Sequence, residues 1–164
     1  MRKKSLLVLL VVLSMMLFAL AGCGKSEPKP EVTTDFPNNS IVKYLPEDKG
    51  CQKLIADMKD GKIPTSCDVL YDEMGGRASV VTEDPSTITE LYNLFTQITV
   101  GEKTDESITD SYHHVIFTLQ DGTKVAFSFE SDIWCYGSGI EDRVKVNESG
   151  PFWKKVREMQ DEEM

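Results

Sequence analysis

The stretch HHVIFTLQDGTKVAFSF (residues 113–129) holds the most regular pattern of this 164-residue chain. Apolar side chains recur at every second position before and after Asp121-Gly122. An Asp-Gly pair between two alternating runs is a strong local signal for a β-hairpin. The sequence therefore predicts two antiparallel strands, over residues 113–119 and 125–129, that bury one face.

Segments on both sides of this hairpin predict further elements. β-branched and aromatic residues between turn signals predict four short strands, at residues 67–71, 78–82, 133–136 and 143–146. Capping signals and helical apolar spacing predict three helices: residues 47–60, a helix that starts at Asp84-Pro85, and one that starts at Gly150-Pro151. Residues 101–111 are predicted to form a polar loop.

This order of elements predicts an α+β fold: an antiparallel sheet of five to six strands with helices packed mainly on one face. The length is suited to one domain with a core of its own, over residues 41–164. It is too short for a two-lobed solute-binding protein, and it contains no internal repeat.

The first 23 residues have the layout of an export signal. Three basic residues precede an apolar run over residues 6–20, which is shorter than the roughly 20 residues that a membrane-spanning helix needs. Leu20-Ala21-Gly22-Cys23 follows this run and resembles the lipobox of bacterial lipoprotein signal peptides. The charged start, the length of the apolar run and the four lipobox residues all agree with that family.

The resemblance implies that residues 1–22 are a signal peptide and that diacylglycerol is attached to the thiol of Cys23. Residues 23–40 would then form a lipidated N-terminus and a flexible, proline-containing tether. We therefore expect a lipid anchor in the cell membrane, with the domain on the extracytoplasmic face. The layout of the domain resembles small secreted domains of Gram-positive lipoproteins, and this second resemblance implies no activity.

The mature chain is strongly acidic. Residues 1–22 contain three of the 18 basic residues and none of the 27 acidic ones, so their removal leaves a net charge of −12. Such a charge argues against a nucleic-acid partner, which needs a basic surface. It also argues against a domain that lies flat on anionic lipid.

Three cysteines remain beside Cys23. A disulfide between Cys51 and Cys67 would close a loop of about 16 residues and contribute on the order of 3 kcal/mol. The alternative is that Cys51, Cys67 and Cys135 are small buried side chains. Their spacing lacks the close cysteine pairs of a zinc site, and we expect neither a metal nor another cofactor.

Two further groups of residues are weak candidates for chemistry. His113 and His114 are neighbours on a predicted strand, so they point to opposite faces and cannot easily share a metal ion. Cys135 with either histidine would imitate a thiol hydrolase, but its strand-like surroundings lack the positive groups that activate a thiol. We therefore expect no enzyme activity.

Acidic residues cluster at two places in the chain. Asp105, Glu106 and Asp110 lie in the predicted polar loop, and Glu130 and Asp132 lie near the aromatic strand. These clusters lack the pattern of a calcium-binding loop. We expect them to form a solvated surface.

Aromatic residues near the C-terminus are the best candidates for binding. Trp134, Tyr136 and Trp153 are a possible surface for a peptide or glycan, although residues at such spacing more often fill a core. The leading hypothesis is a membrane-anchored binding or accessory module, with an envelope protein as a possible partner. The alternatives are an inhibitor or immunity-type protein that sequesters a secreted enzyme or toxin, and a hydrolase of envelope polymers.

Overall fold

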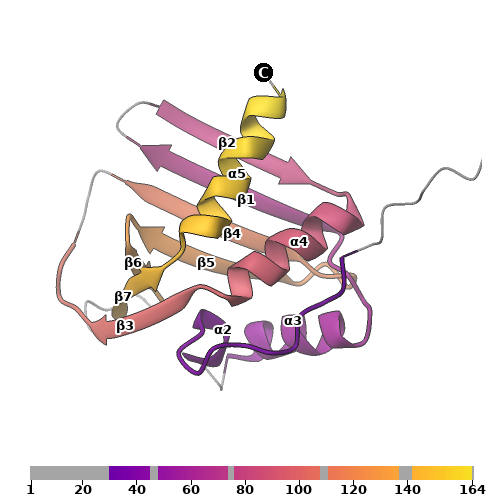
Figure 1. Cartoon of the computed structure of the whole chain (residues 1–164), viewed down its shortest axis with the longest axis horizontal. Coiled ribbons are helices and arrows are strands. Elements are labelled where there is room, and N and C mark those ends of the chain that lie inside the picture. The colour runs from indigo at the N-terminus through magenta and orange to yellow at the C-terminus, as the bar shows by residue number, and fades with distance from the viewer. Residues whose placement is uncertain (1–29, 45–47, 74–75, 108–110, 137–141, 164) are drawn as a thin grey trace, which may run out of the picture.

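The computed structural model describes residues 30–44, 48–73, 76–107, 111–136 and 142–163 (Figure 1). The predicted signal peptide and Cys23 lie outside these residues. The described part of the chain forms one antiparallel sheet of seven strands and four helices. This confirms the predicted α+β class, with a sheet slightly larger than the five to six strands expected.

The sheet does not follow the order of the chain. Its strands are β1 (Ser66–Glu73), β2 (Gly76–Thr82), β3 (Thr99–Lys103), β4 (Tyr112–Thr118), β5 (Lys124–Glu130), β6 (Ile133–Cys135) and β7 (Arg143–Glu148). In space they are ordered β2-β1-β4-β5-β6-β7-β3. The hairpin of β4 and β5 is therefore central, and β3 pairs with β7 at the far edge.

The helices are α2 (Ile41–Tyr44), α3 (Lys49–Lys59), α4 (Pro85–Thr96) and α5 (Gly150–Glu163). Helices α4 and α5 cross the same face of the sheet, and α3 lies below β5 in the view of Figure 1. The carboxylate of Asp84 accepts a hydrogen bond from the Thr87 N–H at 2.8 Å, and Pro85 is the first residue of α4. The start predicted for α4 is therefore confirmed.

The predicted hairpin is present, with a turn one residue longer than an Asp-Gly pair. The Leu119 N–H donates to the Thr123 carbonyl at 2.8 Å, and the Gly122 N–H donates to the Leu119 carbonyl at 2.9 Å. Gly122 has a φ of 82°. Residues 120–122 thus form a three-residue loop, a turn followed by a left-handed glycine.

The apolar face of the hairpin packs beneath the helices. Phe95 of α4 is at its centre, with ring centroids 4.5 Å from Phe127, 5.7 Å from Phe117 and 5.5 Å from Phe152 of α5. Such aromatic pairs contribute about 0.5–1.5 kcal/mol each beyond the burial of their area. One side chain of α4 therefore joins both central strands to the C-terminal helix.

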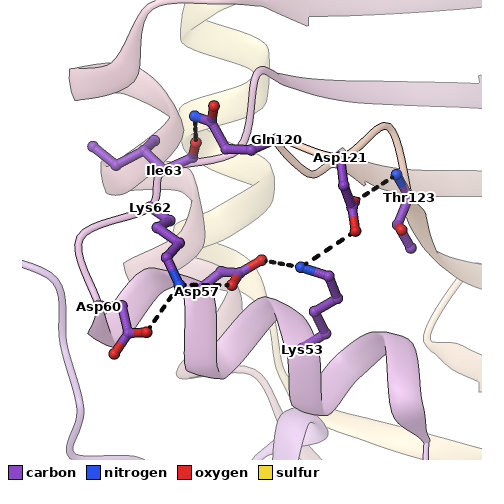
Figure 2. A network of polar contacts seen from close by, with 8 residues as sticks. All are labelled: Lys53, Asp57, Asp60, Lys62, Ile63, Gln120, Asp121 and Thr123. Atoms are coloured by element: carbon purple, nitrogen blue, oxygen red, sulfur yellow. Dashed lines mark hydrogen bonds and ion pairs between the residues drawn. The ribbon is translucent and has the colours of Figure 1, made fainter.

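Polar contacts attach the hairpin turn to α3 (Figure 2). The Lys53 ammonium lies between the carboxylates of Asp57 and Asp121, 3.5 Å from the second. The Gln120 amide donates to the carbonyl of Ile63 at 2.7 Å. Exposed ion pairs contribute little stability, so we regard this network as fixing the position of the turn.

Strand β3 was not predicted, because the sequence places residues 101–111 in a loop. Only Val100 is fully buried in β3, so the strand lacks the alternation that marks β4 and β5. Its pairing with β7 also contains register shifts. A short, irregular edge strand of this kind gives almost no periodic signal.

Residues 31–40 differ from the flexible tether predicted for residues 23–40. The side chain of Asn93 in α4 accepts from the Thr33 N–H at 2.8 Å and donates to the Glu31 carbonyl at 2.7 Å. Phe36 is only 9% exposed and joins the core. Ser40 then pairs with Thr99 along the edge of β3. The folded domain therefore begins near Glu31, about ten residues earlier than expected.

The hairpin turn gives a first prediction. Gly122→Ala should lower the free energy of unfolding by about 1–2 kcal/mol, because only glycine adopts a positive φ without strain. A Cβ at Gly122 would meet no atom within 4 Å, so the cost is that of the backbone alone. Urea unfolding followed by circular dichroism measures the change.

Gly50→Ala is the matched control for this substitution. Gly50 lies in the first turn of α3, and a Cβ there meets the Asp48 carboxylate and Val125 at 3.4 Å or more. This variant should be as stable as the wild type or more stable. Equal losses in the two variants would contradict the role given to the Gly122 backbone.

Candidate functional site

The three aromatic residues predicted to form one binding surface are in two separate places. Trp134 is a core residue, 2% exposed, and its ring packs 5.6 Å from Tyr44 and 5.5 Å from Tyr136. Trp153 lies on α5, with its ring 5.0 Å from that of His113. The prediction of a common surface is wrong, because β6 and α5 place these rings on the walls of different cavities.

The larger cavity lies beside α5 and has a volume of about 280 Å³. We call it the α5 cavity. Its aromatic lining comes from three elements: Tyr71 of β1, His113 of β4 and Trp153 of α5. The Trp153 indole is also in edge contact with Phe129 and Phe152, at 5.8 and 5.0 Å, so the core holds it in one orientation.

His113 is buried in the wall of this cavity, with 7% of its surface exposed. Its Nε2 lies 3.1 Å from the Ser111 hydroxyl. His114 points to the other face of the sheet, where its Nδ1 lies 3.0 Å from the Ser128 hydroxyl. In the part of the chain that the structure describes, no three histidine, cysteine or acidic side chains are grouped closely enough to hold a metal ion.

The turn between β5 and β6 forms the rim of the α5 cavity. Glu130 pairs with Ile133, so Ser131 and Asp132 make a two-residue turn. Ser131 has a φ of 54°, where glycine is usual. The Ser131 N–H donates to the Ser111 carbonyl at 3.1 Å, and this bond joins the turn to the start of β4. Strained residues of this kind are often found at binding sites.

Helix α5 contributes the positive charge of the cavity through Arg157. The other two basic side chains of this helix are paired: Lys154 with Glu158 at 3.3 Å and Lys155 with Glu90 at 2.8 Å. Within the described residues, Arg157 makes neither a hydrogen bond nor an ion pair. A guanidinium at the mouth of an aromatic cavity is thus available to an incoming group.

The second cavity has a volume of about 220 Å³ and lies between α3 and β5. Trp134, Tyr136 and Cys51 line it together with Lys124. Most of its wall is core side chains that already pack against one another. The α5 cavity is larger and carries more polar groups, so we take it as the candidate binding site.

The predicted Cys51–Cys67 disulfide is not formed: both cysteines are buried free thiols. The Cys51 thiol donates to the Val42 carbonyl at 3.8 Å. Burial, with a smaller effect from Asp48, raises the pKa of Cys51 to about 12. Burial also raises the pKa of Cys67. The alternative that these residues are small core side chains is therefore the one observed.

Cys135 lies on the face of the sheet opposite the helices. It pairs across the strands with Ser128, which pairs with His114, so the three form one row. Burial and then the charge of Glu130 raise the pKa of the Cys135 thiol, against a weaker lowering by Arg143. A nucleophilic thiol requires the opposite shift.

The sequence predicted that Glu130 belongs to a solvated acidic surface, and this prediction is wrong. Glu130 is 4% exposed and accepts a hydrogen bond from the Arg143 guanidinium at 3.1 Å. Arg143 also donates to the Glu106 carbonyl at 2.9 Å. The segment after β3 therefore covers a buried ion pair, whereas Glu106 itself pairs with Lys145 at the surface. Asp110 lies outside the described residues.

Sequence reasoning named Trp153 as a possible binding residue, considered His113 only as a weak candidate for metal or acid–base chemistry, and missed Tyr71, Ser131 and Arg157. These five residues come from different parts of the chain, and only the sheet order brings them together. One signal was available for Arg157, since it follows Trp153 by four residues on a predicted helix and therefore shares its face.

The raised thiol pKa values predict how the cysteines react. At pH 8, iodoacetamide should leave Cys51 and Cys67 unmodified in the folded protein, because their thiols remain protonated and buried. Both should be alkylated after unfolding in guanidinium chloride. Peptide mass spectrometry locates the modified residues. A disulfide-linked peptide pair, or fast alkylation of Cys51 in the folded state, would contradict this description.

The backbone of Ser131 gives a further prediction. The free energy of unfolding of Ser131→Gly should be about 1 kcal/mol higher than that of Ser131→Ala. Both variants lose the hydroxyl, but only glycine adopts the positive φ without backbone strain. Urea unfolding of the two variants measures the difference. If the alanine variant equals the glycine variant in stability, Ser131 is not strained.

No family model, curated protein or solved structure matches this chain. No helix among the described residues is long and apolar enough to cross a membrane.

Proposed function

We propose that this protein is a lipid-anchored binding module on the extracytoplasmic face of the cell membrane, and that the α5 cavity is its ligand site. The lipobox at residues 20–23 supports the anchor. The concave α5 cavity, with an aromatic lining and a few polar groups, supports the binding role.

The observation that carries the binding proposal is that Trp153 and Arg157 line the same cavity. They come from successive turns of one helix. The core fixes the indole of Trp153, while Arg157 lacks a partner among the described residues. Fixed aromatic rings and available arginines are the residues that most often dominate binding energy.

The anchor is tested by replacing the lipidated thiol. Intact-mass spectrometry of the wild type should show a chain that begins at Cys23 and carries the mass of the diacylglycerol. Cys23→Ser should lack that mass, because serine offers no thiol for the thioether. Cys135→Ser is the matched control and should keep the lipid. A wild-type chain without lipid would contradict the anchor.

The binding role is tested by sedimentation of the full chain, in detergent, with isolated cell-wall fractions. Trp153→Leu should reduce sedimentation at least tenfold if the α5 cavity holds the ligand. Lys154→Gln, a change on the same helix outside the cavity, should have no effect. Equal sedimentation of wild type and Trp153→Leu would exclude this cavity as the site.

A further inference from the structure

The lining of the α5 cavity favours one class of ligand over others. We propose that the cavity binds an acidic sugar residue, a pyranose ring that carries a single carboxylate. This inference rests on the proposed function, because it assigns the ligand of the same site. It follows from three properties of the lining: its aromatic surface, its hydroxyl groups and its charges.

The aromatic surface suits a rigid ring. Trp153 is held by His113, Phe129 and Phe152, so its indole loses little conformational entropy when a ligand packs on it. The C–H groups on one side of a pyranose ring form a small apolar surface, and an amphipathic aromatic side chain is suited to contact it. A volume of about 280 Å³ corresponds to a small ligand, such as a single ring with its substituents.

Three serines line the cavity together with these aromatic residues. Ser111, Ser131 and Ser149 come from the start of β4, the β5–β6 turn and the residue before α5. Each serine hydroxyl both donates and accepts hydrogen bonds, as the hydroxyls of a sugar do. The Ser111 hydroxyl already lies 3.1 Å from the Nε2 of His113, but a purely apolar ligand would displace water from the serines without offering them hydrogen bonds, which is costly. The lining therefore favours a polyhydroxylated ring.

The charges of the lining select among sugars. Arg157 presents a guanidinium without a partner in the described structure, and such a group forms paired hydrogen bonds with a carboxylate. In a chain with a net charge of −9, an arginine that makes no ion pair among the described residues marks a place where an anion is attracted. This is the argument for an acidic sugar over a neutral one.

Asp132 limits the charge of the ligand. Asp132 lines the same cavity, and its negative charge would repel a doubly charged phosphate more strongly than a single carboxylate. The carboxylate of Asp132 can accept hydrogen bonds from ring hydroxyls. A sugar with one carboxylate can therefore offer hydroxyls to Asp132 and a carboxylate to Arg157, and it meets less repulsion from Asp132 than a sugar phosphate does.

The experiment compares two sugars that differ at one carbon. Full-length protein in detergent is titrated with D-glucuronate and with D-glucose, which share the ring and differ only in the carboxylate at C6. The readout is the indole N–H signal of Trp153 in nitrogen-15 NMR spectra, with the signal of the core residue Trp134 as an internal reference. Wild type should bind glucuronate about tenfold more tightly than glucose, the effect of one charge-assisted contact.

Matched variants assign that preference to Arg157. Arg157→Gln should weaken glucuronate binding to the level of glucose and leave glucose binding unchanged. Lys154→Gln removes an equal charge from the same helix outside the cavity and should keep the preference. Trp153→Leu should weaken the binding of both sugars, and for this variant the ring-proton signals of the sugar replace the indole readout.

Three results would overturn the sugar proposal: equal affinity for the two sugars, loss of the preference in Lys154→Gln as well, or no shift of the Trp153 signal with either sugar. The sedimentation experiment separates this failure from that of the binding module. If Trp153→Leu reduces sedimentation but the sugar titrations give one of the three results above, the binding module is supported and the sugar proposal is rejected. If the cavity binds the sugar but sedimentation is the same for wild type and Trp153→Leu, the sugar proposal stands and the role of this cavity in envelope binding is excluded.

Discussion

The packing of Phe95 against the central hairpin is the contact on which the other elements depend. Strands β4 and β5 bury one face, and that face needs a cover that α4 supplies through this ring. The same ring contacts Phe152 and so fixes where α5 crosses the sheet. Because α5 also carries Trp153 and Arg157, the position of the α5 cavity follows from the packing of the core.

Elements with a local signal were predictable from the sequence, and elements held by distant contacts were not. The β4–β5 hairpin follows from its alternation, and the start of α4 follows from Asp84-Pro85. Residues 31–40 have a composition typical of a linker, yet Asn93, about 60 positions away, bonds to their backbone. No periodicity marks such a contact. The same limit applies to Glu130, whose burial depends on Arg143 and on the segment after β3.

The candidate site shows this limit most clearly. Trp134 and Trp153 each have an aromatic neighbour in the sequence, but Trp134 lies on β6 and Trp153 on α5, and the fold places them on the walls of different cavities. Trp134 is 2% exposed and packs in the core beside the second cavity, whereas Trp153 lines the α5 cavity. Aromatic content therefore indicated that a binding surface was plausible, but the partition between core and cavity is a property of the fold.

The attachment of Glu31 to α4 restricts how far the domain can move from the bilayer. Seven residues lie between Cys23 and Glu31, so a fully extended chain joins these two positions over at most about 30 Å. If Cys23 is lipidated as proposed, this short linker keeps the domain next to the lipid headgroups. Molecules or polymers that never approach that layer lie beyond its reach, so proximity to the membrane itself acts as a filter on what the domain meets.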